Sequence, residues 1–262
     1  MTDYESRAAN ERAHNKHVAE SAAALSSEDV ARFAPAVPAF EFAFEIYYRY
    51  LDRRMPNRKL DEYVLARQAR SPRSLRLLSL GCGTGDWEID VARRSGGRLA
   101  VTLADLTPEL LEKAADAGRR EDLNVETKVC DVNEILLPER AFDFIVCRSS
   151  LHHFLKLEHV FDQINRGLTA EGRFLVLGEW VGRNGLQYYP QAERIIQAIF
   201  QALPARLRLN RYTNETDSRI PSIDFGANSF EAIRSQEIVG LLMERFDPVE
   251  HVLYDGIVTP LL

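Results

Sequence analysis

The chain has 262 residues, of which 45% are hydrophobic and 27% charged, an ordinary balance for a globular protein that can bury a sizeable core. Its net charge of -6, without a lysine- or arginine-rich block, argues against a nucleic acid partner. The charged first thirty residues lack the apolar core of a signal peptide, and no apolar run approaches the roughly 20 residues of a membrane helix, so we expect a cytoplasmic protein without membrane contact.

The first part of the chain predicts helices. The segment 39–54 follows two prolines and carries aromatic side chains at helical spacing. The segment 60–69 predicts a second helix, which ends before Ser71-Pro72. We therefore expect residues 1–73 to form a helical cap or lid.

From residue 74 onward, short apolar runs alternate with helical patterns. Strands are predicted within residues 75–80, 98–107, 125–132, 142–150 and 172–180. Helices are predicted within residues 86–97, 108–118 and 159–168, the second with Thr107 as N-cap and Pro108 in its first position. This alternation predicts an α/β fold: a Rossmann-like, doubly wound, mostly parallel sheet with helices on both faces. Such sheets bind ligands at the carboxyl ends of their strands.

After residue 180 the pattern becomes irregular. Residues 181–228 predict an insertion over the active site, with a helix within 190–208 followed by a polar stretch. Residues 229–262 predict a helix within 235–246 and a sixth strand within 249–256, which complete the core. The final apolar residues either begin a seventh strand or continue into further chain.

A loop of three glycines follows the first strand. Gly81, Gly83 and Gly85 are spaced G-x-G-x-G, and Asp86 stands where a dinucleotide-binding loop has its third glycine. A carboxylate at this helix start repels a pyrophosphate, and the Gly-Lys-Ser/Thr of a P-loop is absent from the sequence. The loop therefore favours a positively charged ligand without phosphate.

The sequence around this loop resembles the class I S-adenosylmethionine-dependent methyltransferases. The resemblance covers residues 75–180 and lies in "LSLGCGTG", "LADLTPELLEKA", "VCDVNEI", "FDFIVCRSSLHHF" and "GLTAEGRFLVLGEW". The last segment has Ala170-Glu171-Gly172 where the family has a Pro-Gly-Gly turn. The resemblance implies S-adenosylmethionine as cofactor, S-adenosylhomocysteine as product, and methyl transfer to a small-molecule acceptor.

The resemblance also implies roles for individual residues. The glycine loop would hold the amino-acid end of the cofactor, Asp105 both ribose hydroxyls, and Asp131 the adenine amino group. Val132 would offer its backbone amide to the adenine ring. The full set expected to bind the cofactor is Gly81, Cys82, Gly83, Gly85, Asp86, Asp105, Leu106, Asp131, Val132 and Arg148.

Candidate catalytic residues lie just after the fourth strand and at the end of the fifth. Methyl transfer to a hydroxyl or a protonated amine requires removal of a proton, and His152 and His153 stand where a base would be needed. Glu179 would orient a histidine or bind the acceptor. Alternatively, the histidines only hydrogen-bond neighbouring loops. His159 adds no third metal ligand to this pair, and the three cysteines lack metal spacing, so no metal is expected.

Tyrosines from two segments are candidates for acceptor binding. Tyr47 and Tyr48 precede the core, and Tyr188 and Tyr189 follow it. The alternative for the first pair is that they pack their helix against the sheet.

We expect O-methylation, with N-methylation next. Residues 178–208 and 229–246 resemble bacterial methyltransferases, and this resemblance implies secondary-metabolite or surface-sugar metabolism. A non-catalytic S-adenosylmethionine-binding partner subunit is the main alternative, and a homodimer stays open. A nicotinamide-dependent oxidoreductase is disfavoured by Asp86 and by the glycine spacing.

Overall fold

A five-stranded parallel sheet forms the centre of the protein. The computed structural model describes residues 4–10, 12–13, 49–51, 53, 59–210 and 215–253. The strands are β1 (Arg76–Leu80), β2 (Ala100–Asp105), β3 (Val125–Val129), β4 (Phe142–Arg148) and β5 (Leu168–Leu177). Their order in the sheet is β3-β2-β1-β4-β5, and every pairing is parallel.

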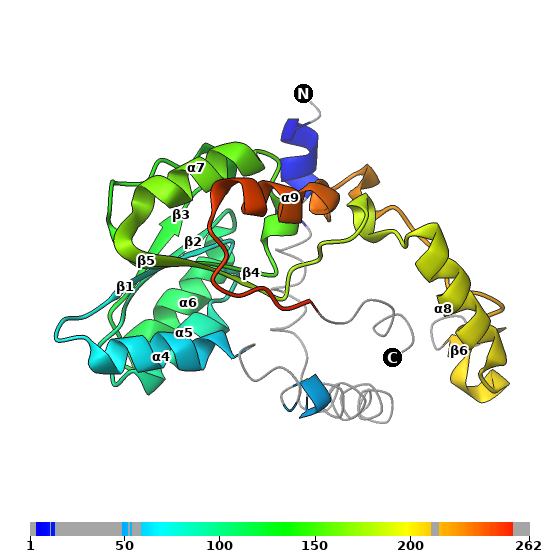
Figure 1. Ribbon diagram of the computed structural model, residues 1–262, viewed down its shortest axis with the longest axis horizontal. Coiled ribbons are helices and arrows are strands. Elements are labelled where there is room, and N and C mark those ends of the chain that lie inside the picture. Colours follow the sequence, from blue (N-terminus) through cyan, green and yellow to red (C-terminus); the bar gives the residue numbers. More distant parts are fainter. Residues whose placement is uncertain are drawn as a thin grey trace.

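Helices cover both faces of this sheet (Figure 1). From residue 59 onward the described helices are α4 (Leu60–Arg70), α5 (Asp86–Arg94), α6 (Pro108–Arg120), α7 (Leu157–Gly167), α8 (Pro190–Ala202) and α9 (Ser235–Arg245). In Figure 1, α7 and α9 lie over one face, and α4, α5 and α6 lie over the other. The predicted doubly wound α/β fold is confirmed.

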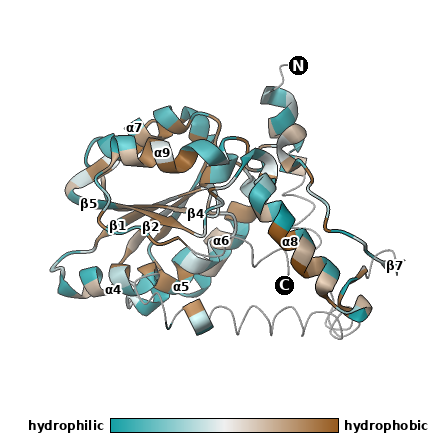
Figure 2. Ribbon diagram, turned by 45° about the vertical axis from the view of Figure 1, so that its right-hand side comes forward, coloured by the Kyte–Doolittle hydropathy of each residue, from teal (hydrophilic) through white to brown (hydrophobic). Residues whose placement is uncertain are grey.

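The two central strands are buried on both faces. Leu78 and Ile145 belong to the apolar cluster that includes α7 and α9, whereas Leu77 and Phe144 belong to the cluster that includes α4, α5 and α6. Figure 2 shows the apolar strands between helices whose outer faces are largely hydrophilic. Burial on both faces explains why these strands appear in the sequence as short continuous apolar runs.

The chain after β5 forms a projecting arm. α8 ends at Ala202, just before Leu203-Pro204, and is followed by a hairpin of β6 (Leu209–Asn210) and β7 (Glu215–Thr216). Figure 1 shows this arm extending to one side, away from the sheet and the helices that cover it. The sequence predicts that residues 181–228 cover the active site, and this stays a prediction; within this segment α8 extends outward in Figure 1.

The predicted sixth strand covers residues 249–256, of which the structure describes 249–253. Residues 249–253 are not in a strand, which departs from the prediction for 249–256. The remainder of that predicted strand and the apolar final residues lie outside the described part of the chain.

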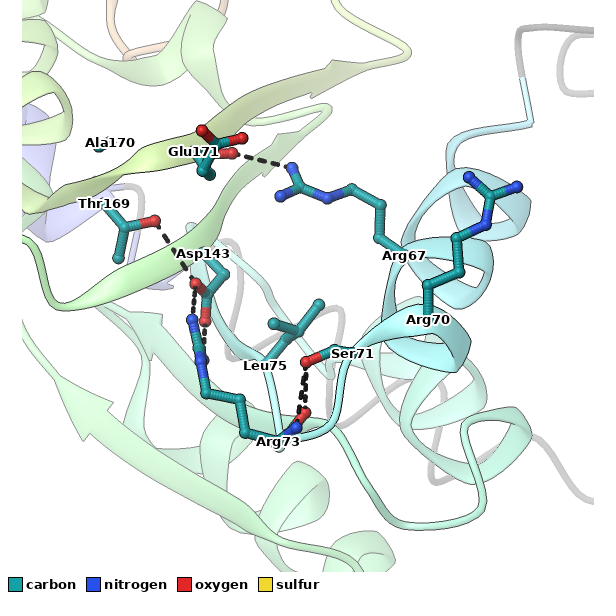
Figure 3. A pocket seen from close by; sticks show the side chains of 9 residues that line it. All are labelled: Arg67, Arg70, Ser71, Arg73, Leu75, Asp143, Thr169, Ala170 and Glu171. Carbon is teal, nitrogen blue, oxygen red and sulfur yellow. Dashed lines mark hydrogen bonds and ion pairs between the residues drawn. The ribbon is translucent and has the colours of Figure 1, made fainter.

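The buried carboxylate of Asp143 stabilises the end of the sheet at which the parallel strands begin (Figure 3). Asp143, 3% exposed near the start of β4, accepts hydrogen bonds from Arg73 at 2.8 and 2.6 Å and from the Arg76 backbone at 2.9 Å. Burial alone would raise the pKa of Asp143, but these donors and the two arginine charges lower it. A pocket of about 520 Å³ beside this pair is lined by α4, by the segment between α4 and β1, and by the starts of β4 and β5. It lies at the opposite end of the strands from the glycine loop.

Replacing Asp143 by asparagine is expected to lower the free energy of unfolding by roughly 1–3 kcal/mol at neutral pH, because charge-assisted hydrogen bonds are lost. A carboxylate whose pKa is lowered in the folded protein stabilises it above the ordinary pKa of about 4. That contribution disappears as the pH falls through the lowered pKa. Urea unfolding at several pH values should therefore show that the difference in free energy of unfolding between wild type and variant becomes smaller below about pH 4.

Asp116→Asn is the matched control, because Asp116 pairs with Arg119 on the exposed surface of α6. It should change stability by less than about 1 kcal/mol. If the loss of unfolding free energy in Asp143→Asn did not change with pH, the stabilising role of the ionised Asp143 carboxylate would be wrong.

Candidate active site

The site lies where the strand order of the sheet reverses. β1 pairs with β2 on one side and with β4 on the other, so the loops after β1 and β4 leave the sheet beside each other. The hydroxyl of Ser150, after β4, donates to the Leu80 carbonyl at the end of β1 at 2.8 Å. Ligands of open α/β sheets bind at this position.

The glycine loop adopts a conformation that favours glycine. Gly81, Gly83 and Gly85 have φ of 67°, 58° and 66°, in the left-handed region. The backbone N–H of Gly81 donates to the Ala104 carbonyl at 2.8 Å, which fixes the start of the loop. A Cβ at Gly83 would meet nothing within 4 Å, so this part of the loop faces open space.

Asp105 ties the end of β2 to this loop. One of its carboxylate oxygens accepts the Gly83 N–H at 2.8 Å, and the other accepts the Thr107 N–H at 2.9 Å. Each carboxylate oxygen can accept two hydrogen bonds, so the side chain is oriented and keeps acceptor capacity. Two hydroxyl groups could be bound there, as the ribose prediction requires.

Other predicted cofactor residues lie around the loop. Burial, and then the charge of Asp105, raise the pKa of the Cys82 thiol, which therefore forms a neutral wall. Asp86 begins α5, is exposed, and accepts a hydrogen bond from the Thr84 hydroxyl at 2.8 Å. Leu106 is half-buried after β2, and Arg148 is exposed at the end of β4.

Asp131 lies in the loop after β3 and is contacted by the N-terminal helix. It precedes a short helical turn, η2 (Val132–Glu134), and accepts the Asn133 N–H at 2.9 Å. Val132 is buried. The hydroxyl of Tyr4, in the helical residues 4–10, donates to the second carboxylate oxygen of Asp131. The Tyr4 ring also packs against Phe230 at 5.4 Å. No motif marked Tyr4 in the sequence.

Glu179 organises the loop after β4. Its buried carboxylate, 3% exposed, accepts the backbone N–H groups of Ser150 and Leu151 at 2.7 and 3.0 Å. It also accepts the Nδ1–H of His152 at 2.8 Å. Burial would lower the pKa of His152, but Glu179 and Glu231 together raise it to about 9. The structure thus brings two predicted catalytic residues together, and Glu179 orients His152.

Glu231 is a residue of this site that sequence reasoning missed. One carboxylate oxygen lies 3.4 Å from Nε2 of His152, and the other lies 3.6 Å from Nε2 of His153. The segment is held in place by the Ile233 N–H, which donates to the His152 carbonyl at 3.1 Å. His159 lies elsewhere, with Nε2 bonded to the Ile135 carbonyl at 2.9 Å. Nothing in the sequence pattern linked Glu231 to the histidines.

Of the predicted acceptor-binding tyrosines, the structure describes Tyr188 and Tyr189. Tyr188 is half-buried, and its carbonyl accepts a hydrogen bond from Arg183 at 2.9 Å. Burial, and then the charge of Glu193, raise the pKa of Tyr188. Tyr189 precedes α8 and is 49% exposed. Tyr47 and Tyr48 lie outside the described residues.

Comparison with known proteins points to one family. Residues 77–172 match a family described as "Methyltransferase domain". The chain is similar to 27-O-demethylrifamycin SV methyltransferase of Amycolatopsis mediterranei, with 32% identity over 108 residues, 40% of this chain and 39% of the relative. It is also similar to the ubiquinone/menaquinone biosynthesis C-methyltransferase UbiE of Bordetella parapertussis, with 28% identity over 115 residues, 44% of each chain.

Among solved structures, a S-adenosylmethionine-dependent methyltransferase from Mesorhizobium loti matches with 24% identity and a TM-score of 0.37, over 43% of this chain and 50% of that one. The chain spans less than half of the length of the two curated relatives. No helix in the described part of the chain is both long and apolar enough to cross a bilayer. The match to the methyltransferase domain family thus spans residues 77–172, the segment that holds the glycine loop, Asp105, Asp131 and the two histidines.

Proposed function

We propose that the chain transfers a methyl group from S-adenosylmethionine to an oxygen atom of a small-molecule acceptor. The observation that carries this proposal is the position of Asp105. It ends β2 beside the glycine loop, accepts the Gly83 N–H, and keeps acceptor capacity for a diol. A carboxylate beside a glycine loop that also carries Asp86 suits a cationic ligand without phosphate.

The residues present fit this cofactor. In the proposal, the loop around Gly83 holds the amino-acid end, Asp105 holds the ribose, and Asp131 with Val132 holds the adenine. Tyr4 already occupies one oxygen of Asp131, so the N-terminal helix would lie against the bound adenine. When bound, the cofactor supplies an electrophilic methyl group on a sulfonium.

The acceptor side is defined by His152, His153 and Glu231. Transfer to a hydroxyl requires that its proton be lost, and these side chains form an ionisable cluster at the sheet edge next to the loop. The side chain of His153 is 27% exposed against 10% for His152, so His153 is the one placed to contact an acceptor. Glu179 acts through His152 as a positioning residue.

Two relatives suggest different methyl-accepting atoms. The name of the rifamycin relative describes methylation of an oxygen, and the name of the UbiE relative describes methylation of carbon. We favour oxygen, because a cluster of two histidines and a carboxylate suits the deprotonation of a hydroxyl. Methylation of nitrogen is the second candidate.

Asp105→Asn is expected to weaken S-adenosylmethionine binding roughly 10- to 100-fold, because charge-assisted hydrogen bonds are each worth about 1.5–3 kcal/mol. Titration calorimetry with S-adenosylmethionine and S-adenosylhomocysteine measures this loss. Asp116→Asn, on the exposed side of α6, should bind like wild type. Equal affinities for wild type and Asp105→Asn would refute the assignment of Asp105.

The acceptor atom is tested by S-adenosylhomocysteine release with hydroxylated, amine and demethylquinol acceptors, followed by mass spectrometry and NMR of the product. An O-methyl product supports the proposal, and a C- or N-methyl product reassigns the atom. Cofactor binding with no turnover of any class would favour the non-catalytic partner subunit. Protection from thermal unfolding by NAD instead of S-adenosylmethionine would favour an oxidoreductase.

A further inference from the structure

Three potential metal ligands converge at the acceptor side of the site. The ligand atoms of His152, His153 and Glu231 all lie within 4.8 Å of one another. The Nε2 atoms of the two histidines lie 3.4 and 3.6 Å from the two oxygens of Glu231. Ligand atoms at about 2.05 Å from a tetrahedral Zn²⁺ are about 3.4 Å apart, so these spacings suit a shared ion.

The tautomer of His152 supports the same conclusion. Its Nδ1 faces the buried carboxylate of Glu179 at 2.8 Å and therefore carries a hydrogen that it donates. The Nε2 atom then points toward Glu231. A cation must lie between this nitrogen and the carboxylate: a proton in the metal-free protein, or a metal ion that replaces that proton. A carboxylate that accepts from one ring nitrogen of a histidine, while the other nitrogen binds a metal, is the usual second shell of such sites.

We propose that His152, His153 and Glu231 bind a divalent transition metal ion of the zinc type, with an open position for the acceptor oxygen. This inference rests on the proposed function and deepens it. Two histidines and one carboxylate form the ligand set of zinc sites that keep a fourth position open for catalysis. The sequence indicates no metal, because His159 is the only further histidine close to the pair along the chain and it does not face them in the structure.

The ion would prepare the acceptor for methyl transfer. A hydroxyl bound to Zn²⁺ loses its proton to water at neutral pH far more readily than a free one. An oxygen lone pair then forms the new C–O bond while the C–S bond of the sulfonium breaks and leaves its electrons on sulfur. The products are the methyl ether, the neutral thioether and one released proton.

Metal binding is tested on the full chain without cofactor or acceptor. After treatment with a chelator, titration calorimetry with Zn²⁺ and the visible d–d absorption of added Co²⁺ report the site directly. Wild type should bind one ion, and Glu231→Gln and His153→Asn should each weaken binding by more than about 100-fold, because even second-shell changes cost 10- to 100-fold. Glu231→Asp, which keeps the carboxylate, should retain part of the affinity.

His159→Asn is the matched control and should bind Zn²⁺ like wild type, because its ring nitrogen bonds to a backbone carbonyl. Circular dichroism and thermal unfolding confirm that each variant is folded. Absence of Zn²⁺ and Co²⁺ binding by wild type, or binding that survives both Glu231→Gln and His153→Asn, would overturn the proposal. If the protein binds S-adenosylmethionine but no metal, only the metal proposal fails. If it binds metal but not S-adenosylmethionine, only the proposed methyltransferase function fails.

Discussion

Glu179→Ala is expected to lower the free energy of unfolding by roughly 3–5 kcal/mol, the range found when one partner of a buried charged network is removed. The change removes the acceptor of the Ser150 and Leu151 N–H groups and of the His152 ring. These donors lie at a buried position after β4, where water replaces the lost carboxylate poorly. Urea unfolding measured by circular dichroism gives the difference.

Glu171→Ala is the control, because Glu171 is exposed on β5 and its contact with Arg67 uses its backbone carbonyl. It should change stability by less than about 0.5 kcal/mol. Glu179→Gln keeps one acceptor oxygen and should fall between the two. Equal stability of Glu179→Ala and Glu171→Ala would show that the loop after β4 does not depend on this carboxylate.

Gly81→Ala is expected to cost roughly 2–5 kcal/mol of stability and to reduce S-adenosylmethionine binding strongly. A side chain at φ of 67° is strained by about 1–2 kcal/mol. The new Cβ would lie 2.8 Å from Cβ of Ser150, and overpacking of this kind costs about 1–3 kcal/mol. Ser150 cannot readily move, because its hydroxyl bonds to the Leu80 carbonyl.

Substitutions at two other glycines measure the backbone strain without the steric clash between the new Cβ and Ser150. Gly96, after α5, has φ of 69°, and a Cβ there meets nothing within 4 Å, so Gly96→Ala should show the strain alone. Gly83→Ala carries the same strain within the loop, again without a collision. Urea unfolding and calorimetry on the three variants measure both effects. If Gly81→Ala were no less stable than Gly96→Ala, the close packing of the loop after β1 against Ser150 would be contradicted.

The sheet was predictable because its signals are local. Each strand is a short apolar run, and the helices begin at residues that suit helix starts, such as Thr107-Pro108 before α6. The prediction was less accurate after β5. α8 ends at Ala202 although its helical pattern continues to residue 208, because Pro204 follows.

Most of the candidate site was predictable for a related reason. Asp105 is the last residue of β2, and Asp131 and His152 follow β3 and β4, so all three lie at the carboxyl ends of parallel strands, which lie together on one side of the sheet. Glu231 and Tyr4 were missed because each reaches the site from a distant segment, Tyr4 through 127 positions to Asp131. Contacts of that kind depend on how distant loops pack over the carboxyl ends of the strands, and the hydrophobic pattern of a sequence does not predict this packing.

The Arg73–Asp143 pair has a practical consequence for engineering. It sits at the start of β4, and the histidine loop follows the end of the same strand, about 20 Å further along. Cross-links, surface immobilisation or stabilising substitutions introduced beside Arg73 are therefore expected to leave the candidate site at the other end of the strands unchanged. Stability and the proposed methyl transfer are therefore expected to respond to changes at opposite ends of the same strands.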